Sequence, residues 1–297
     1  MRLARFGDNR LGLVEGSVDG AVSICVRDVT AALDVLPGVR FPVPPGDLLI
    51  ANLDAVLDRA RALAPKAPLV PLKDVALLSP VANPGKVVAA PVNYEKHLNE
   101  VRGDADLHHN NAITTIHQAG LFLKAASSVV GAGDGIALDM LDRRSDHEVE
   151  LAVVIGREAR RVTRGEALGH VAGYCIGLDI TIRGSEERSL RKSLDSYTVL
   201  GPWMVTADEV GSPDALDLRL SVNGELRQQS NTQFLIKKVA ELIEYASSFY
   251  TLYPGDVLMT GTPEGVAPIY PGDTIEGTIS TIGTVRVGVR AASTGQA

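Results

Sequence analysis

DHEVELAVVI, residues 146–155, is the stretch that decides the fold of this chain. Its last five residues are apolar and mostly β-branched, which is typical of a buried strand. Side chains alternate between the faces of a strand, so Glu148 and Glu150 point the same way. Two like charges at the mouth of a buried strand repel each other and lose hydration, and a hard cation would relieve both costs. The alternative is a solvated strand end with two surface acids. This pattern alone does not distinguish that alternative from a metal site.

A third acid extends the candidate metal site. Asp179 lies in a second apolar stretch, GYCIGLDI at residues 173–180. If the three carboxylates meet, their oxygen atoms suit Mg²⁺ or Mn²⁺, and also Ca²⁺. His147 alternates to the opposite face from the two glutamates, so we do not expect it to be a ligand.

The composition argues against several classes of protein. Hydrophobic residues make up 45% of the 297 residues and charged residues 22%, as in ordinary globular proteins. A net charge of −7 without a basic run argues against a nucleic-acid partner. The two cysteines, Cys25 and Cys175, predict no disulfide framework and fit a reducing cytoplasm. We see no signal peptide and no run of membrane-spanning length, so we expect a cytoplasmic protein without a membrane partner.

Turn residues and prolines divide the chain into two expected domains. Residues 1–78 are predicted to form a small N-terminal α+β domain. It has short hairpin strands between residues 10 and 26 and a helix over 48–63. The prolines between residues 65 and 71 are expected to end that helix and to form a stiff linker. Residues 79–297 are predicted to form the main domain.

Strands are expected to outnumber helices in the main domain, which predicts a β-dominated α+β fold. The clearest helix covers residues 236–249, with apolar residues on one face. The polar stretch 104–118 is expected to be a loop. The expected strands cover residues 87–90, 151–155, 218–222, 257–260, 274–279 and 284–289.

Two further groups of residues suggest acid–base chemistry. His97 and Glu100 share a face if they lie on a helix, and a carboxylate beside an imidazole makes a general base. The alternative is a pair of polar residues on an exposed turn. Lys192 is suited to hold a carboxylate or to stabilise an oxyanion. Its alternative is a solvated basic face shared with Arg188 and Arg191.

Residues 260–265, TGTPEG, form a glycine-bearing loop after a predicted strand. The hydroxyl groups and backbone amides of such a loop are suited to a substrate carboxylate. It is not a phosphate-binding loop, because the spaced glycines and the terminal Lys-Ser/Thr pair are absent.

Several short sequence blocks, in their order along the chain, resemble those of the fumarylacetoacetate hydrolase superfamily over most of residues 80–290. Any one block is weak, but their order is specific and favours the metal site and the general base over the alternatives. The blocks are NY at 93–94 before His97 and Glu100, LFLK at 121–124, the acidic block at 146–150, Asp179, KSLD at 192–195, LGPW at 200–203, VNGE at 222–225, PGD at 254–256 and TGTP at 260–263.

The resemblance implies a fold and a role for each candidate residue. The expected fold is a mixed β-sandwich roll behind a small N-terminal domain, in a homodimer. The expected dyad of His97 and Glu100 activates water and lies on a lid, here residues 97–117. The implied metal ligands are Glu148, Glu150 and Asp179, Lys192 lies beside metal and substrate, and the substrate-binding positions are Lys124, Arg183 and Thr262. After Asp179 the chain departs from the family pattern at residues 182–186, which leaves the substrate open.

We therefore expect a metal-dependent hydrolase that cleaves a C–C bond in a 2,4-dioxo acid of the acylpyruvate or fumarylacetoacetate type, in the catabolism of aromatic compounds or amino acids. His97, backed by Glu100, would deprotonate water, and Lys192 would help hold the charge of the departing pyruvate enolate. The alternative is an isomerase or decarboxylase of an unsaturated 2-oxo dioic acid of the 2-hydroxyhepta-2,4-diene-1,7-dioate type. A non-enzymatic binding protein with a structural metal is a third hypothesis.

Overall fold

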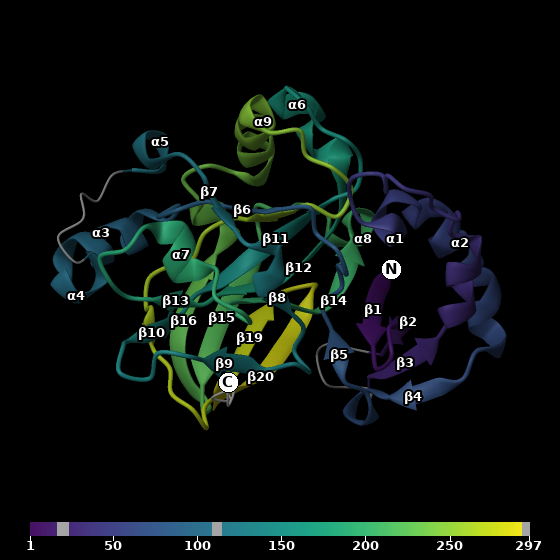
Figure 1. Ribbon diagram of the computed structural model, residues 1–297, viewed down its shortest axis with the longest axis horizontal. Coiled ribbons are helices and arrows are strands. Elements are labelled where there is room, and N and C mark those ends of the chain that lie inside the picture. The colour runs from purple at the N-terminus through teal and green to yellow at the C-terminus, as the bar shows by residue number, and fades with distance from the viewer. Residues whose placement is uncertain (17–23, 109–114, 293–297) are drawn as a thin grey trace.

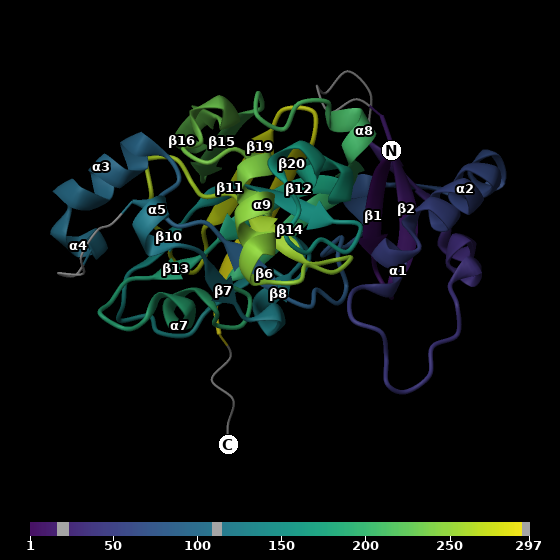
Figure 2. The same ribbon diagram turned by 90° about the horizontal axis from the view of Figure 1, so that it is seen from above.

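The structure, a computed structural model, describes residues 1–16, 24–108 and 115–292. Two β-sheets pack face to face at its centre (Figure 1). The N-terminal strands and helices lie at one end of the long axis. Helices α3 (Glu95–Gly103) and α4 (Ala105–His108) lie at the other end in both views (Figures 1 and 2). The fold is β-dominated α+β, as the sequence predicts.

The larger sheet has twelve strands within the described residues. Neighbouring strands of this sheet are antiparallel, with two exceptions. Strand β17 (Val257–Met259) runs parallel to β6 (Val87–Ala89), and β8 (Val129–Val130) runs parallel to β14 (Thr198–Thr206). A short strand, β5 (Leu77–Leu78), also pairs with β1. In spatial order the other strands are β4 (Leu69–Pro71), β3 (Cys25–Asp28), β2 (Arg10–Glu15), β1 (Arg2–Phe6), β14 (Thr198–Thr206), β12 (Val171–Asp179), β11 (Val149–Ile155), β17 (Val257–Met259), β6 (Val87–Ala89) and β7 (Phe122–Lys124).

Two smaller sheets complete the strand framework of the described ranges. The five-stranded sheet runs β16 (Glu225–Asn231), β15 (Asp217–Val222), β19 (Thr274–Ile279), β20 (Gly283–Ala291) and β9 (Ile136–Leu138). The three-stranded sheet runs β13 (Thr181–Ile182), β10 (Ser145–His147) and β18 (Ala267–Pro268).

The helices are short and lie around the sheets. Helix α1 begins after Asp47, whose carboxylate accepts hydrogen bonds from the amides of Leu49 (3.0 Å) and Ile50 (3.1 Å). None of the described helices has the length and apolar character needed to cross a bilayer. The remaining helices are α1 (Leu48–Ala51), α2 (Leu53–Leu63), α5 (Ile116–Ala119), α6 (Arg164–Ala167), α7 (Arg188–Lys192), α8 (Ala207–Val210) and α9 (Val239–Phe249).

Strand β11 is buried along both faces, and its alternation separates two cores. Leu151 and Val153 belong to the main core, which includes residues of the five-stranded sheet. Ala152 and Val154 belong to a second core on the other face of the large sheet. Even-numbered positions of β11 therefore point away from the interior of the sandwich, and Glu150 is one of them.

The structure corrects three local expectations. The helix predicted over residues 48–63 is interrupted at Asn52, which separates α1 from α2. Part of the predicted proline linker forms β4, the outermost strand of the large sheet, where a proline costs no internal hydrogen bond. The loop predicted over 104–118 contains the short helices α4 and α5. Its residues 109–114, like residues 21–23 of a predicted hairpin strand, lie outside the described ranges.

The N-terminal segment is joined to the large sheet by backbone pairing. Strand β1 runs antiparallel to β14, with Arg2 opposite Val205 and Leu3 opposite Met204. The first strands of the chain thus continue the sheet that carries β11 and β12. The division into domains at residue 78 stays a prediction.

Candidate metal centre and active site

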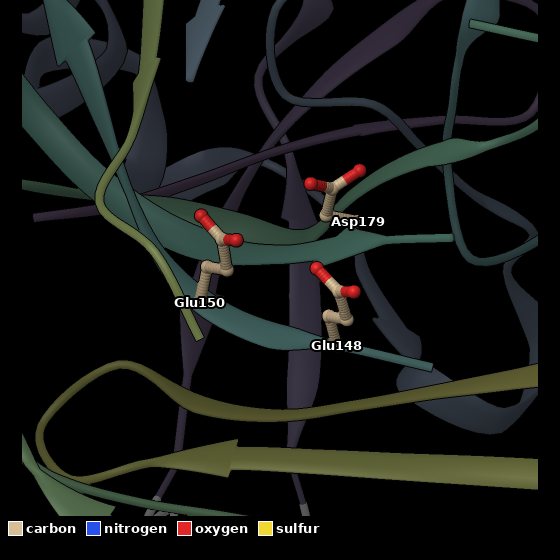
Figure 3. A group of neighbouring side chains, drawn as sticks. All are labelled: Glu148, Glu150 and Asp179. Carbon is tan, nitrogen blue, oxygen red and sulfur yellow. The ribbon is translucent and has the colours of Figure 1, made fainter. Parts of the chain in front are cut away.

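Glu148, Glu150 and Asp179 come together as the sequence predicts. One carboxylate oxygen from each residue lies within 4.8 Å of the corresponding oxygens of the other two. Figure 3 shows the three side chains projecting from neighbouring strands toward a common space. All three are buried, so their negative charges have little hydration.

Strand pairing places the three acids. Glu148 lies between β10 and β11, and Glu150 lies on β11 opposite Gly177 of β12. The backbone amide of Asp179 donates to the carbonyl of Glu148 at 2.9 Å, so the end of β12 is held beside the start of β11. The period of two along each strand then turns all three side chains to the same face.

Two buried cations hold Glu148 and Asp179. The Nζ of Lys192 donates to Glu148 Oε2 and to Asp179 Oδ2, each at 2.7 Å. Arg183 donates to Glu148 Oε1 at 3.0 Å. Burial opposes ionisation, but the charges of Lys192 and Arg183 outweigh it and hold the pKa of Glu148 well below its usual range.

Glu150 has a different environment. It makes no ion pair within the described residues, and its one hydrogen bond comes from the amide of Gly261 at 2.7 Å. Burial and the charge of Asp179 raise the pKa of Glu150 well above its usual value. A buried carboxylate that makes no ion pair within the described residues, beside two other carboxylates, fits a site for a divalent cation.

Gly261 can approach Glu150 because it has no side chain. Its φ is +98°, and a Cβ there would lie 2.8 Å from the Cβ of Asn93. Asn93 in turn donates from its amide group to the carbonyl of Thr260 at 2.8 Å. The loop predicted to bind substrate is therefore fixed against the metal site.

His97 and Glu100 form the expected pair on α3. The Nδ1 of His97 lies 2.8 Å from Glu100 Oε2, and Glu100 Oε1 accepts a hydrogen bond from the amide of Gly265 at 2.8 Å. A carboxylate at Nδ1 favours the tautomer with its proton on that nitrogen, which leaves Nε2 as the basic atom. His97 lines the same cavity as the three carboxylates.

That cavity has a volume of about 330 Å³, which suits a small metabolite. Thr262, Arg183 and Lys192 line it, as expected of substrate-binding or catalytic residues. Lys124 does not reach its wall. Its Nζ lies behind Asp179, where it donates to that carboxylate and to the carbonyl of Tyr197 at 2.8 Å. A direct contact of Lys124 with substrate stays a prediction.

Sequence reasoning missed several residues that shape the site. Asp146 accepts a hydrogen bond from Arg183 Nε at 2.7 Å. The sequence contained a signal for this residue, because Asp146 has the same alternation as Glu148 and Glu150. Gln228 of β16 donates to Thr262 Oγ1 at 2.8 Å and lies 3.1 Å from Nδ1 of His147. Arg188 lines the cavity, although the alternative reading placed it on a solvated face.

The comparisons with known proteins agree with this geometry. The family described as fumarylacetoacetate (FAA) hydrolase C-terminal matches residues 86–290. A maleylpyruvate hydrolase from Aquipseudomonas alcaligenes is 56% identical over 292 residues, which is 98% of this chain and 99% of that protein. A mitochondrial oxaloacetate tautomerase from Bos taurus is 37% identical over 96% of this chain and 90% of its own length.

A solved structure extends the comparison to three dimensions. The crystal structure of a maleylpyruvate hydrolase from Sphingobium sp. SYK-6, in complex with manganese(II) and pyruvate, is similar with a TM-score of 0.81. The two chains are 36% identical, and the match covers 99% of this chain and 100% of the other. On the fold, the site and these matches together, the chain belongs to the fumarylacetoacetate hydrolase family.

Proposed function

We propose that this protein is a divalent-metal-dependent hydrolase that cleaves a C–C bond in an acylpyruvate, a 2,4-dioxo acid. The observation that carries the proposal is one cavity lined both by a buried carboxylate triad and by a histidine with an orienting glutamate. The 56% identity to a maleylpyruvate hydrolase supports the reaction type. The manganese(II) and pyruvate named for the solved relative support the metal class and one product.

Glu148, Glu150 and Asp179 would hold the cation, either Mn²⁺ or Mg²⁺. When bound, the ion would supply a Lewis acid and a template for the 2-oxo acid end of the substrate. Lys192 has a second task in this arrangement. Its ammonium group, 2.7 Å from Glu148 and from Asp179, also faces the cavity, so it can stabilise negative charge on a substrate oxygen.

The protein's own residues account for the proton transfers. Glu100 fixes the ring of His97, and Nε2 of His97 accepts a proton from water. The water oxygen bonds to the distal carbonyl carbon, C4, and the C3–C4 bond then breaks with its electron pair staying on C3. This gives the carboxylic acid of the acyl part and the enolate of pyruvate. Protonation of C3 by His97 completes pyruvate and restores the base.

Product analysis tests the reaction. Purified protein with Mn²⁺ and maleylpyruvate should yield pyruvate and a second carboxylic acid in equal amounts, as followed by NMR. Controls are protein with chelator and Mn²⁺ without protein. Loss of substrate without release of pyruvate would contradict hydrolysis.

A second candidate function shares the same site. Isomerisation or tautomerisation moves only a proton, and the oxaloacetate tautomerase relative at 37% identity favours it. The same NMR experiment separates the two, because an isomerase gives one product with every carbon of the substrate, whereas a decarboxylase also releases CO₂.

Three broader expectations stay proposals. We propose that residues 79–297 form the catalytic domain, which the family match over 86–290 supports. We propose that the protein is a homodimer, which light scattering of the purified protein would test. We also propose that it acts in the cytoplasm, which fractionation of the source cells would test.

A further inference from the structure

Arg188 lies on the wall of the active-site cavity. It begins α7 and lies four residues before Lys192, so the two side chains share one face of the helix. Both line the active-site cavity. The guanidinium carbon of Arg188 lies 5.5 Å from the ring centroid of Phe122, and the Nζ of Lys192 lies 5.7 Å from the same ring. Phe122 thus forms an aromatic wall beside both cations.

Within the described residues, Arg188 differs from the neighbouring cations in having no hydrogen-bond or ion-pair partner. Lys192 and Arg183 bond to carboxylates of the metal site, and Arg191 donates from Nε to the carbonyl of Glu186 at 2.8 Å. The guanidinium of Arg188 makes no hydrogen bond or ion pair with any residue in the described ranges.

The two acids that precede Arg188 in the sequence make their hydrogen bonds with other groups, although the charge of Glu187 also acts on Arg188. Glu186 forms an ion pair with Arg143 at 2.8 Å. The carboxylate of Glu187 accepts from the amide of Ser189 at 2.6 Å. Arg188 is itself half-buried, and burial lowers its pKa. A guanidinium that has lost part of its hydration without gaining an acceptor favours an anion supplied by a ligand.

We propose that Arg188 binds a second carboxylate, at the acyl end of the substrate, and so selects 2,4-dioxo acids with two carboxylates over those with a neutral acyl chain. This rests on the proposed function. A guanidinium can bind a carboxylate through two parallel hydrogen bonds. A methyl group in the same place would leave the guanidinium without an acceptor, which penalises the neutral substrate.

A simpler role for Arg188 makes a different prediction. If it only balanced the charge of Glu148 and Asp179, its loss would affect every substrate alike. Selectivity between two substrates is therefore the measurement that separates recognition from general electrostatics.

The experiment compares maleylpyruvate, which carries a terminal carboxylate, with acetylpyruvate, which ends in a methyl group. Values of kcat/KM are measured with Mn²⁺ for the wild type and for Arg188→Gln. We expect Arg188→Gln to lose about 10–100-fold on maleylpyruvate and little on acetylpyruvate. Arg188→Lys should recover part of the loss, because it keeps the charge but not the two-pronged geometry.

Arg157→Gln is the matched control, because Arg157 is exposed and lies outside the cavity lining. It should match the wild type on both substrates. Thermal unfolding and Mn²⁺ titration should show that Arg188→Gln is folded and binds metal.

Two results would overturn the inference about Arg188 but not the proposed function. They are an equal loss of kcat/KM on both substrates in Arg188→Gln, or no loss on either. A wild type that releases pyruvate from neither substrate would contradict the proposed function itself, and the inference would fall with it.

Discussion

The three grouped carboxylates and His97 face one cavity, but the protein holds the carboxylates and the His97–Glu100 pair in different ways. The carboxylates lie on, or directly before, the adjacent antiparallel strands β11 and β12, which run through the middle of the large sheet. Buried residues cover both faces of these strands. Strain or motion at this site would disturb the central core, so the site is pre-organised.

The helix that carries the pair has a much smaller anchor. Val101 of α3 packs with Leu107 and Val266 in a cluster separate from the main core. Two polar links join α3 to the loop at 260–265: the bond from the amide of Gly265 to Glu100, and an exposed ion pair between Lys96 and Glu264 at 3.4 Å. The three carboxylates therefore lie on strands held in the core, whereas His97 lies on a helix with fewer core contacts. Motion of residues 97–117 as a lid stays a prediction.

Replacing His97, the proposed base, without changing the strands is the strongest test of this contrast. His97→Ala should lower kcat by about 10²–10⁴-fold, because water loses its proton acceptor. Its affinity for Mn²⁺, measured by calorimetry, should stay that of the wild type, since His97 is not among the three grouped ligands. Arg102→Ala, an exposed change on the same helix, is the control. Full activity in His97→Ala would assign the base to another residue.

Metal binding at the strand carboxylates should raise the melting temperature of the protein. At a free Mn²⁺ concentration of 100 times Kd, binding adds about 2.7 kcal/mol to the stability, or roughly 4 °C in Tm for a chain of 297 residues. Glu148→Gln should remove most of this shift, because it removes one ligand and a partner of Lys192. Glu158→Gln changes an exposed acid and should keep the shift. The same Mn²⁺ shift in all three proteins would count against the metal site.

The smallest expected effect concerns motion. Binding of oxalate with Mn²⁺ should slow hydrogen exchange across residues 97–103 more than across residues 151–155. The strand segment is already protected by pairing on both sides, so a ligand can add little there. Equal changes in the two segments would mean that α3 is a fixed wall of the cavity.

The sequence predicted the parts of the site that depend on local periodicity. The shared face of Glu148 and Glu150 follows from alternation along one strand, and the His97–Glu100 contact follows from helical spacing. His147 also behaves as alternation predicts, because it meets Gln228 of the other sheet rather than the metal site. Each of these inferences needs only a few neighbouring residues.

Contacts between distant segments could not be predicted in this way. Arg183 and Glu148 are 35 residues apart, and Gln228 and Thr262 are 34 apart, so no periodic pattern links them. The same limit applies to β4, where a proline-rich stretch reads as a linker until β3 pairs with it. Sheet pairing and buried ion pairs depend on the whole fold, and local propensity does not encode them.

The pairing of β1 with β14 has a consequence for what can be removed from this protein. Apart from β1, the described residues that pair on that side of β14 are Val129 and Val130 of β8, opposite Thr198 and Val199. A protein shortened to residues 79–297 would expose the unpaired backbone groups of Met204 and Val205 to solvent. Open strands of this kind recruit strands from other chains. We therefore expect the first residues of the chain, which lie away from the active-site cavity, to shield this stretch of β14 from pairing with strands of other molecules.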